Sequence, residues 1–259
     1  MNVMQQAARK ASRRLVRDFG EVENLQVSRK GPSDFVTAAD VRTDEMLRDL
    51  LLQARPDFGF LTEKNKEMVG KDGRRRWIID PVDGTINFLH GIPMFAISIA
   101  LEESGEITAG LVYAPIPDEM FWAEKGQGAY LNNRRLRVAA RRQIGDAVIG
   151  TCIPHSGRSD NRSYPIEILA IADECAGIRG MGSAALDLAY VAAGRFDGFW
   201  ETGLSPWDIS AGLLLAKEAG AIVSRTDGGS DPLYKGEILA ANEAIHSRML
   251  RLIQKARRN

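Results

Sequence analysis

The sequence has few of the features that mark several large classes of protein. It contains two cysteines, Cys152 and Cys175, whose spacing fits neither a metal site nor a redox motif, so we expect reduced thiols. Lysine plus arginine and aspartate plus glutamate each total 34, which leaves no net charge for coating a polyanion. The longest apolar stretches, such as 94–101, fall short of the ~20 residues of a membrane helix. The segment 1–20 lacks the apolar centre of a signal peptide, so we expect a cytoplasmic protein without a membrane span.

The composition that is present is typical of a folded chain, with 44% hydrophobic and 26% charged residues. Apolar residues at helical spacing predict helices over 4–22 and 39–54, separated by a turn-rich loop at 29–34. Between 77 and 138, strand-length apolar runs alternate with turn signals, which predicts a meandering, largely antiparallel sheet. The runs are 77–79, 95–101, 107–113 and 119–123.

The pattern changes after Ala139, where strand-like and helical segments alternate as in an α/β arrangement. We therefore expect two halves, 1–143 with the helices and the antiparallel sheet, and 144–259 with the α/β part, packed as one compact unit. The strands expected in the second half are 147–151, 198–201, 221–224 and 238–241, and the helices are 165–176, 183–193, 207–219 and 243–257.

The most informative segment is an apolar strand, 77–79, that runs directly into Asp80-Pro81-Val82-Asp83-Gly84-Thr85. It delivers two carboxylates and a hydroxyl to a strand end, where loops build sites on a rigid scaffold. Pro81 stops the strand, and Gly84 lets backbone N–H groups approach an anion because it has no Cβ. Carboxylate oxygens are the ligands that Mg²⁺ prefers, so the segment suits cations together with a phosphate. An ordinary Asp-Gly turn exposed to solvent remains the alternative.

Other acids are informative only through their context. Glu63 follows the short apolar run 58–61, which again places an acid at a strand end, although a surface position remains open. Asp208 opens an apolar helix, and its ordinary role there is to cap the helix N-terminus. Asp40 and Asp44 lie four residues apart on the helix expected over 39–54, which favours a solvated helix face.

Taken together, these segments resemble the inositol monophosphatase family, and most of all its bacterial extragenic suppressor (SuhB-like) branch. The resemblance rests on Asp-Phe-Val-Thr-Ala-Ala-Asp at 34–40, on Glu63, on Asp-Pro-Val-Asp-Gly-Thr-Ile-Asn-Phe at 80–88, on Trp-Asp-Ile-Ser-Ala-Gly at 207–212, and on Glu-Ala-Gly at 218–220. Their order and spacing agree with the family over nearly the whole chain.

The resemblance implies a layered α+β architecture, the five-layer α-β-α-β-α sugar-phosphatase fold. It also implies a Mg²⁺-dependent phosphomonoesterase that holds two or three Mg²⁺ ions per subunit and hydrolyses a small phosphorylated polyol, myo-inositol monophosphate, by attack of water. Such enzymes are usually homodimers, and sensitivity to Li⁺ is expected from the family. Metal ions can activate the water and neutralise the leaving alkoxide, so no covalent intermediate is required.

The same resemblance assigns roles to individual residues. The metal ligands implied are Glu63, Asp80, the carbonyl of Val82, Asp83 and Asp208. The catalytic residues implied are Glu63, Asp83, Thr85 and Asp40, with Thr85 and Glu63 orienting the water and Asp40 and Lys30 supporting it from near the metal. The residues implied on the substrate side are Gly84, Thr85, Gly182, Ser183, Ala184, Asp208 and Glu201, of which Glu201 would hold the ring hydroxyls.

The chain departs from the family pattern beside Glu63. Where the family commonly has Gly-Glu-Glu, this sequence has Thr62-Glu63-Lys64, which replaces the second acid by a cation. An ammonium near the site would repel Mg²⁺ and attract phosphate, and the net effect depends on where Lys64 points. We expect Lys64 to weaken metal binding.

Two groups of alternatives remain. Relatives in the wider superfamily act on 3′-phosphoadenosine 5′-phosphate, fructose 1,6-bisphosphate, histidinol phosphate or NADP, and the sequence does not exclude these substrates. A different class of function is a regulatory protein that binds the transcription machinery or RNA, as some members of the suppressor branch do. The basic clusters 74–76, 134–135, 141–142 and 255–258 suit it, but zero net charge favours scattered solvated charge instead.

Overall fold

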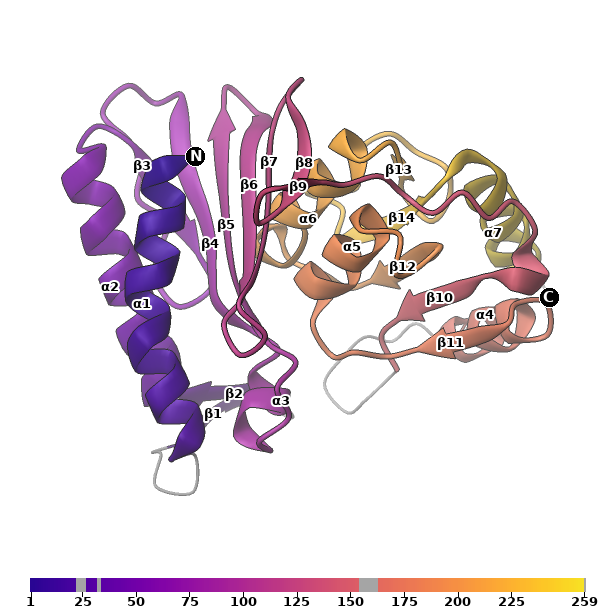
Figure 1. Cartoon of the computed structure of the whole chain (residues 1–259), viewed down its shortest axis with the longest axis horizontal. Helices are drawn as coiled ribbons and strands as arrows, with labels where there is room; N and C mark the ends of the chain where they lie inside the picture. Colours follow the sequence, from indigo (N-terminus) through magenta and orange to yellow (C-terminus); the bar gives the residue numbers. More distant parts are fainter. Residues whose placement is uncertain (22–26, 32–33, 154–162, 259) are drawn as a thin grey trace.

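The computed structural model of the chain describes residues 1–21, 27–31, 34–153 and 163–258, which form two large sheets and a small hairpin (Figure 1). The first large sheet is a meander in the order β3-β4-β5-β6-β7-β8-β9, and only β3 and β4 pair in parallel. This confirms the largely antiparallel sheet expected from the sequence. Its strands are β3 (Gly59–Thr62), β4 (Arg75–Asp83), β5 (Ala96–Glu103), β6 (Glu106–Ala114), β7 (Glu119–Glu124), β8 (Gly128–Leu131) and β9 (Arg134–Arg135).

Both faces of this sheet are buried. In β5, Ile97 and Ile99 belong to a core shared with the N-terminal helices, whereas Ala96 and Ala100 belong to a second core on the opposite face. Successive side chains of a strand point to opposite faces, so a strand covered on both sides needs apolar residues at every position. This explains why residues 95–101 are apolar at every position except Ser98.

The second large sheet has the order β11-β10-β12-β14-β13. The pairs β11–β10 and β10–β12 are parallel, and the pairs β12–β14 and β14–β13 are antiparallel. The chain passes between the two sheets after β9, and we propose 1–143 and 144–259 as two halves of one unit. The strands are β10 (Val148–Thr151), β11 (Gly177–Arg179), β12 (Gly198–Thr202), β13 (Ile222–Ser224) and β14 (Glu237–Ala241).

Helices lie outside and between the sheets, which gives the five α-β-α-β-α layers (Figure 1). One pair, α1 and α2, covers the outer face of the first sheet, α5 and α6 lie between the sheets, and α4 and α7 cover the second sheet. The expected layered fold is confirmed. None of the helices in the described ranges combines the length and apolar character needed to cross a bilayer. The helices are α1 (Asn2–Gly20), α2 (Ala38–Ala54), α3 (Thr85–Leu89), α4 (Tyr164–Ala172), α5 (Ala184–Ala192), α6 (Pro206–Glu218) and α7 (Glu243–Ala256), with a 3₁₀ turn, η2, at Ile144–Asp146.

The prediction of a loop at 29–34 is wrong in part. The chain forms a two-stranded antiparallel hairpin there, made of β1 (Val27–Gly31) and β2 (Asp34–Thr37). Backbone pairing supplies hydrogen bonds for residues whose types alone indicate turns. Lys30 lies in β1, but its side chain falls outside what the structure describes, as do residues 32–33. The short strands β8, β9 and β11 were not expected, since runs of two to four residues carry little periodicity.

The contact between the first sheet and α6 depends on a glycine. A Cβ built at Gly110 in β6 would lie 2.9 Å from the Ala211 carbonyl oxygen and 3.0 Å from its Cα. Backbone atoms cannot move aside as a flexible side chain can, so α6 lies close to the sheet only because residue 110 lacks a side chain. This approach positions the N-terminal end of α6, which carries Asp208.

We predict that Gly110→Val lowers the free energy of unfolding by about 1–3 kcal/mol, because the added methyl groups push α6 from the sheet. Urea denaturation followed by circular dichroism measures the change. Gly20→Ala is the control, since a Cβ there meets no atom within 4 Å. Equal stability of Gly110→Val and the parent protein would show that the helix–sheet contact is not tight.

Candidate active site

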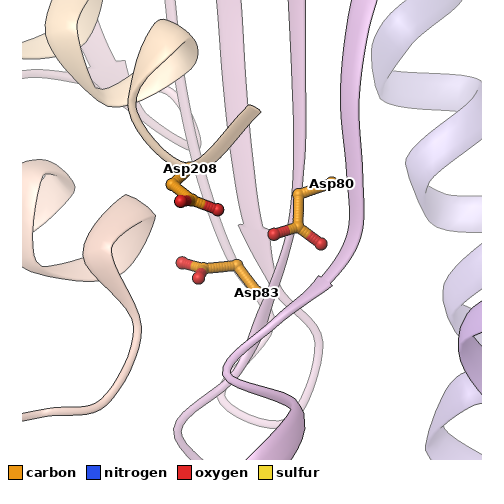
Figure 2. Close-up of side chains that lie close together, drawn as sticks. All are labelled: Asp80, Asp83 and Asp208. Atoms are coloured by element: carbon orange, nitrogen blue, oxygen red, sulfur yellow. The ribbon is translucent and has the colours of Figure 1, made fainter. Parts of the chain in front are cut away.

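Three aspartates from both parts of the chain converge at one point. Asp80 and Asp83 lie in β4 and Asp208 lies in the first turn of α6, and one carboxylate oxygen from each lies within 4.8 Å of those of the other two. Figure 2 shows the three side chains pointing toward a common space. Asp80 is 3% exposed and Asp83 is 8% exposed, so this is not a solvated Asp-Gly turn.

An irregularity in β4 brings the two aspartates of that strand together. In a regular strand, residues three apart point to opposite faces. Here the register with β5 shifts between Asp80 and Asp83, so that Asp80 pairs with Ser98 while Asp83 pairs with Ala96. The Val82 N–H donates to Asp80 Oδ1 at 2.9 Å and stabilises the irregular segment. Both carboxylates can therefore face the same centre.

The N-terminus of α6 holds Asp208. The Ser205 N–H donates to Asp208 Oδ2 at 2.8 Å, and the two residues form a capping box. The capping role considered for Asp208 from the sequence is thus observed, together with its place in the aspartate group. The positive end of the helix dipole also favours a carboxylate at this position.

Asp83 is held by the second half of the molecule. The Ser183 hydroxyl donates to Asp83 Oδ2 at 2.6 Å, and the Ala185 N–H donates to the same oxygen at 2.8 Å. Ser183 is also the N-cap of α5, where its Oγ accepts from the Leu186 N–H at 3.3 Å. The segment expected on the substrate side, which includes Gly182 and Ala184, therefore lies directly beside Asp83.

Asn87 joins the two loops next to this contact, and the sequence had not singled out its role. Its Nδ2 donates to the carbonyls of Met94 and Met181, each at 2.7 Å. Gly84 has φ 97°, and a Cβ there would lie 2.9 Å from the Met94 oxygen; Gly182 has φ 75°, and a Cβ there would lie 2.9 Å from Asn87 Nδ2. Both positions therefore require glycine. The amide of Asn87 within the 80–88 motif was the available signal, but its partners are distant in sequence.

Thr85 and Asp40 lie together beside the aspartate group. Thr85 Oγ1 lies 3.1 Å from Asp40 Oδ1 and 3.0 Å from the Val82 carbonyl oxygen, and donates its hydrogen to one of them. Asp40 Oδ2 accepts from the N–H of Thr37, at 3.0 Å, and from its hydroxyl in the capping box that opens α2. The Asp40 carboxylate is therefore fixed on both oxygens.

The prediction that Asp40 and Asp44 lie on a solvated helix face is wrong, because both residues are fully buried. Asp44 accepts a hydrogen bond from the Asn65 side chain, and burial raises the pKa of its carboxyl. Polar residues at helical spacing indicate a solvent-facing stripe only when no other element covers them. Here the loop after β3 covers this face of α2.

The parallel pairing of β3 and β4 places Glu63 at the site, because Thr62 pairs with Ile79 and Glu63 continues beside Asp80. Lys64 points inward. Its Nζ lies 2.7 Å from Glu63 Oε1 and 3.2 Å from Asp40 Oδ1, and its side chain is 2% exposed. Burial alone would lower the pKa of Lys64, but the carboxylates of Asp40 and Glu63 raise it above its ordinary value, so the ammonium stays charged.

The electrostatics of the group fit a hard cation. Burial raises the pKa of Asp80 well above its ordinary range, and the charges of Glu63, Asp83 and Asp208 raise it further, while Lys64 opposes the rise. Three carboxylates so close together repel one another, and a divalent cation would relieve the repulsion. The all-oxygen donor set suits Mg²⁺ better than a transition metal.

Two further buried acids lie in the second half. Glu201, in β12, is 2% exposed, as its expected place on the substrate side allows. Asp187, in α5, is 1% exposed, and burial together with the charge of Asp83 raises the pKa of its carboxyl well above the usual range. Sequence reasoning had not singled out Asp187, which the apolar residues of α5 surround in the sequence.

Known proteins of one family match this chain over nearly its whole length. A sequence profile of the inositol monophosphatase family matches residues 1–258. An inositol-1-monophosphatase from Mesorhizobium japonicum is 55% identical over 255 residues, which are 98% of this chain and 96% of that protein. The Nus factor SuhB of Escherichia coli is 40% identical over 250 residues, 96% of this chain and 94% of that protein. The crystal structure of extragenic suppressor protein suhB from Bartonella henselae is 54% identical, covers 98% of both chains and has a TM-score of 0.96.

We predict that the effect of Asp80→Asn on stability reverses with metal. Because the folded protein raises the pKa of Asp80, its charged form costs stability at neutral pH. In a chelator, Asp80→Asn should be more stable than the parent protein by about 1 kcal/mol or more. In excess Mg²⁺ the parent should be more stable, since the variant lacks a ligand charge.

Thermal unfolding in chelator and in Mg²⁺ measures this reversal. Asp231→Asn, at an exposed position, is the control and should show no reversal. A parent protein that is more stable than Asp80→Asn even in chelator would contradict the repulsion described for the aspartate group.

Proposed function

The chain belongs to the inositol monophosphatase family, and we propose that it is a Mg²⁺-dependent phosphatase that hydrolyses myo-inositol monophosphate to inositol and phosphate. The observation that carries the proposal is the convergence of Asp80, Asp83 and Asp208 at the end of β4. Three converging carboxylates, of which those of Asp80 and Asp83 are buried, suit a phosphomonoester and the cation that accompanies it when they lie beside a glycine-containing loop.

The three aspartates would hold the cation. The carbonyl of Val82 lies in the same segment, between the two aspartates of β4, and is the further oxygen that the family resemblance implies. A bound Mg²⁺ would supply positive charge that stabilises the phosphoryl oxygens and makes a neighbouring water more acidic. Asp83, fixed through Oδ2 by Ser183 and the Ala185 N–H, would keep its carboxylate directed toward this centre.

Thr85 and Asp40 would orient the attacking water. The hydrogen of Thr85 is engaged by Asp40 or by the Val82 carbonyl, so the lone pairs of its hydroxyl oxygen can accept a hydrogen bond from a water. Asp40 cannot rotate, because Thr37 holds its other oxygen. The water would thus lie at a fixed position next to the phosphate, which is the condition for efficient attack.

The backbone of Gly84 and Thr85 would bind the phosphate. Residue 84 has no Cβ and a positive φ, so an anion can approach the backbone closely. Gly182, Ser183 and Ala184 would border the substrate on the opposite side. Asn87 keeps the two segments together through its bonds to Met94 and Met181.

Glu201 would hold the hydroxyl groups of the inositol ring. A carboxylate on the substrate side favours a neutral polyol and disfavours a substrate with a second phosphate. On this basis we place 3′-phosphoadenosine 5′-phosphate and fructose 1,6-bisphosphate, which carry a second phosphate, behind inositol monophosphate. We place histidinol phosphate behind it because the relative that is 55% identical is an inositol-1-monophosphatase. By family membership we extend the proposal to a cytoplasmic, Li⁺-sensitive homodimer.

A role with the transcription machinery or RNA is the second candidate, and the Nus factor relative favours it. The basic clusters of this chain support it little. Arg76 pairs with Glu102 and Glu67, Arg141 with Asp197, and Arg257 with Glu167. Because these cations already have acidic partners, we retain the phosphatase as the proposal.

We predict Mg²⁺-dependent release of phosphate from myo-inositol 1-phosphate, faster than from the three other phosphoesters. Asp83→Asn should lower kcat by about a hundredfold or more, because it removes a charge at the cation position while the amide can retain the contact with Ser183. A phosphate-release assay with and without Mg²⁺ measures both, with Asp231→Asn as the control. Near-normal turnover by Asp83→Asn would refute the assigned site.

We also predict that Glu201→Gln changes substrate preference more than the chemical step. The ratio of kcat/KM for inositol monophosphate to that for fructose 1,6-bisphosphate should fall about tenfold, the value of one charge-assisted hydrogen bond. Competition assays with both substrates provide the ratio. An unchanged ratio would remove Glu201 from the substrate side.

A further inference from the structure

The ammonium of Lys64 lies between two acids, Asp40 and Glu63, whose carboxylates could otherwise bind a metal cation. Its Nζ contacts both Glu63 Oε1, at 2.7 Å, and Asp40 Oδ1, at 3.2 Å. Only 2% of this side chain is exposed, so almost no water shares the ammonium. A lysine buried to this degree is held by charge complementarity, which the carboxylates of Asp40 and Glu63 supply.

The loop that carries Lys64 is anchored on both sides of it. The Thr62 hydroxyl oxygen accepts from the Asn65 N–H at 3.1 Å, and the Asn65 side chain donates to the buried Asp44 of α2. These bonds fix the backbone on either side of residue 64 and direct its side chain toward the site. The inward position is therefore built into the fold of the loop.

The position of the ammonium divides the acids into two groups. Among the described residues, the aspartates Asp80, Asp83 and Asp208 form the group whose ligand atoms lie within reach of one ion, and Glu63 is not in it. Glu63 instead has the ammonium of Lys64 as its partner. A divalent cation bound to Glu63 would have to lie within a few Å of this positive charge, where repulsion is strong because little water screens it.

We propose that Lys64 is a tethered cation that occupies the place of a divalent ion at Glu63, so that this chain binds metal through Asp80, Asp83 and Asp208 without Glu63. The proposal rests on the proposed function only in taking the aspartate group as the Mg²⁺ site. In this arrangement Glu63 is not a metal ligand but the ion-pair partner of Lys64. The ammonium then supplies permanently a charge that a diffusible ion would otherwise supply.

The test is Mn²⁺ binding to the full chain without substrate, measured by the electron paramagnetic resonance signal of free Mn²⁺. Mn²⁺ replaces Mg²⁺ at oxygen sites. In the parent protein, Glu63→Gln should leave the affinity within about threefold of the parent value, whereas Asp83→Asn should lower it by about tenfold or more. A loss of tenfold or more in Glu63→Gln would overturn the proposal.

Removal of the ammonium gives the complementary result. Lys64→Met should bind an additional Mn²⁺ ion, or bind Mn²⁺ about tenfold more tightly, and the added Glu63→Gln change should abolish this gain. Lys66→Met removes the same charge at a neighbouring exposed residue and should behave as the parent protein. Identical binding by Lys64→Met and the parent would overturn the proposal.

The experiment remains informative if Lys64→Met does not fold in chelator. In that case its thermal midpoint in the presence of Mn²⁺ should rise more steeply with Mn²⁺ concentration than that of the parent. The Mn²⁺ affinity of Glu63→Gln tests the proposal independently of Lys64→Met. Phosphate release separates this inference from the proposed function. A parent protein that shows the expected binding pattern but hydrolyses no phosphoester refutes the function alone, whereas active enzyme whose Mn²⁺ binding requires Glu63 refutes the role of Lys64 alone.

Discussion

The repulsion between buried carboxylates at the end of β4 is the constraint on which the rest of the structure depends. Asp80, Asp83 and Asp208 lie within reach of one ion, and the pKa of Asp80 is raised by burial and by its acidic neighbours. Such a group is unfavourable unless positive charge and hydrogen-bond donors surround it. The N-termini of α5 and α6, the Ser183 hydroxyl and the ammonium of Lys64 provide them. The negative charge that these groups do not compensate would attract a divalent cation.

The two large sheets serve this site in different ways. The first sheet supplies Asp80 and Asp83 through an irregular strand end, and its parallel β3–β4 pair brings Glu63 alongside. The second half supplies the helix N-termini that hold Asp83 and Asp208. Neither half has all three aspartates, so the packing of α6 against β6 at Gly110 also determines where Asp208 lies relative to Asp80 and Asp83. At the capping boxes of Asp40 and Asp208, one carboxylate both caps the N-terminus of a helix and lies at the site.

Much of the fold was predictable because it follows from local patterns. Helical spacing predicted α1 and α2, and the apolar run before Asp80 predicted a strand that delivers carboxylates at its end. The spacing of the residues could not show that Asp208 joins Asp80 and Asp83, because that depends on how α6 packs between the sheets. Only the family resemblance implied that the three aspartates act together. It also misplaced Asp40 and Asp44 on a solvated face, since their burial depends on a loop from another segment. The inward direction of the Lys64 side chain and the hydrogen bonds of Asn87 likewise depend on tertiary contacts between distant segments, which local sequence patterns do not show.

The measurement that tests the central claim most directly is anomalous X-ray diffraction from crystals of the protein soaked in Mn²⁺. We predict an anomalous peak enclosed by the carboxylates of Asp80, Asp83 and Asp208, with oxygen ligands from both halves of the molecule. A peak elsewhere with none among these three side chains, in crystals that have taken up Mn²⁺, would contradict it.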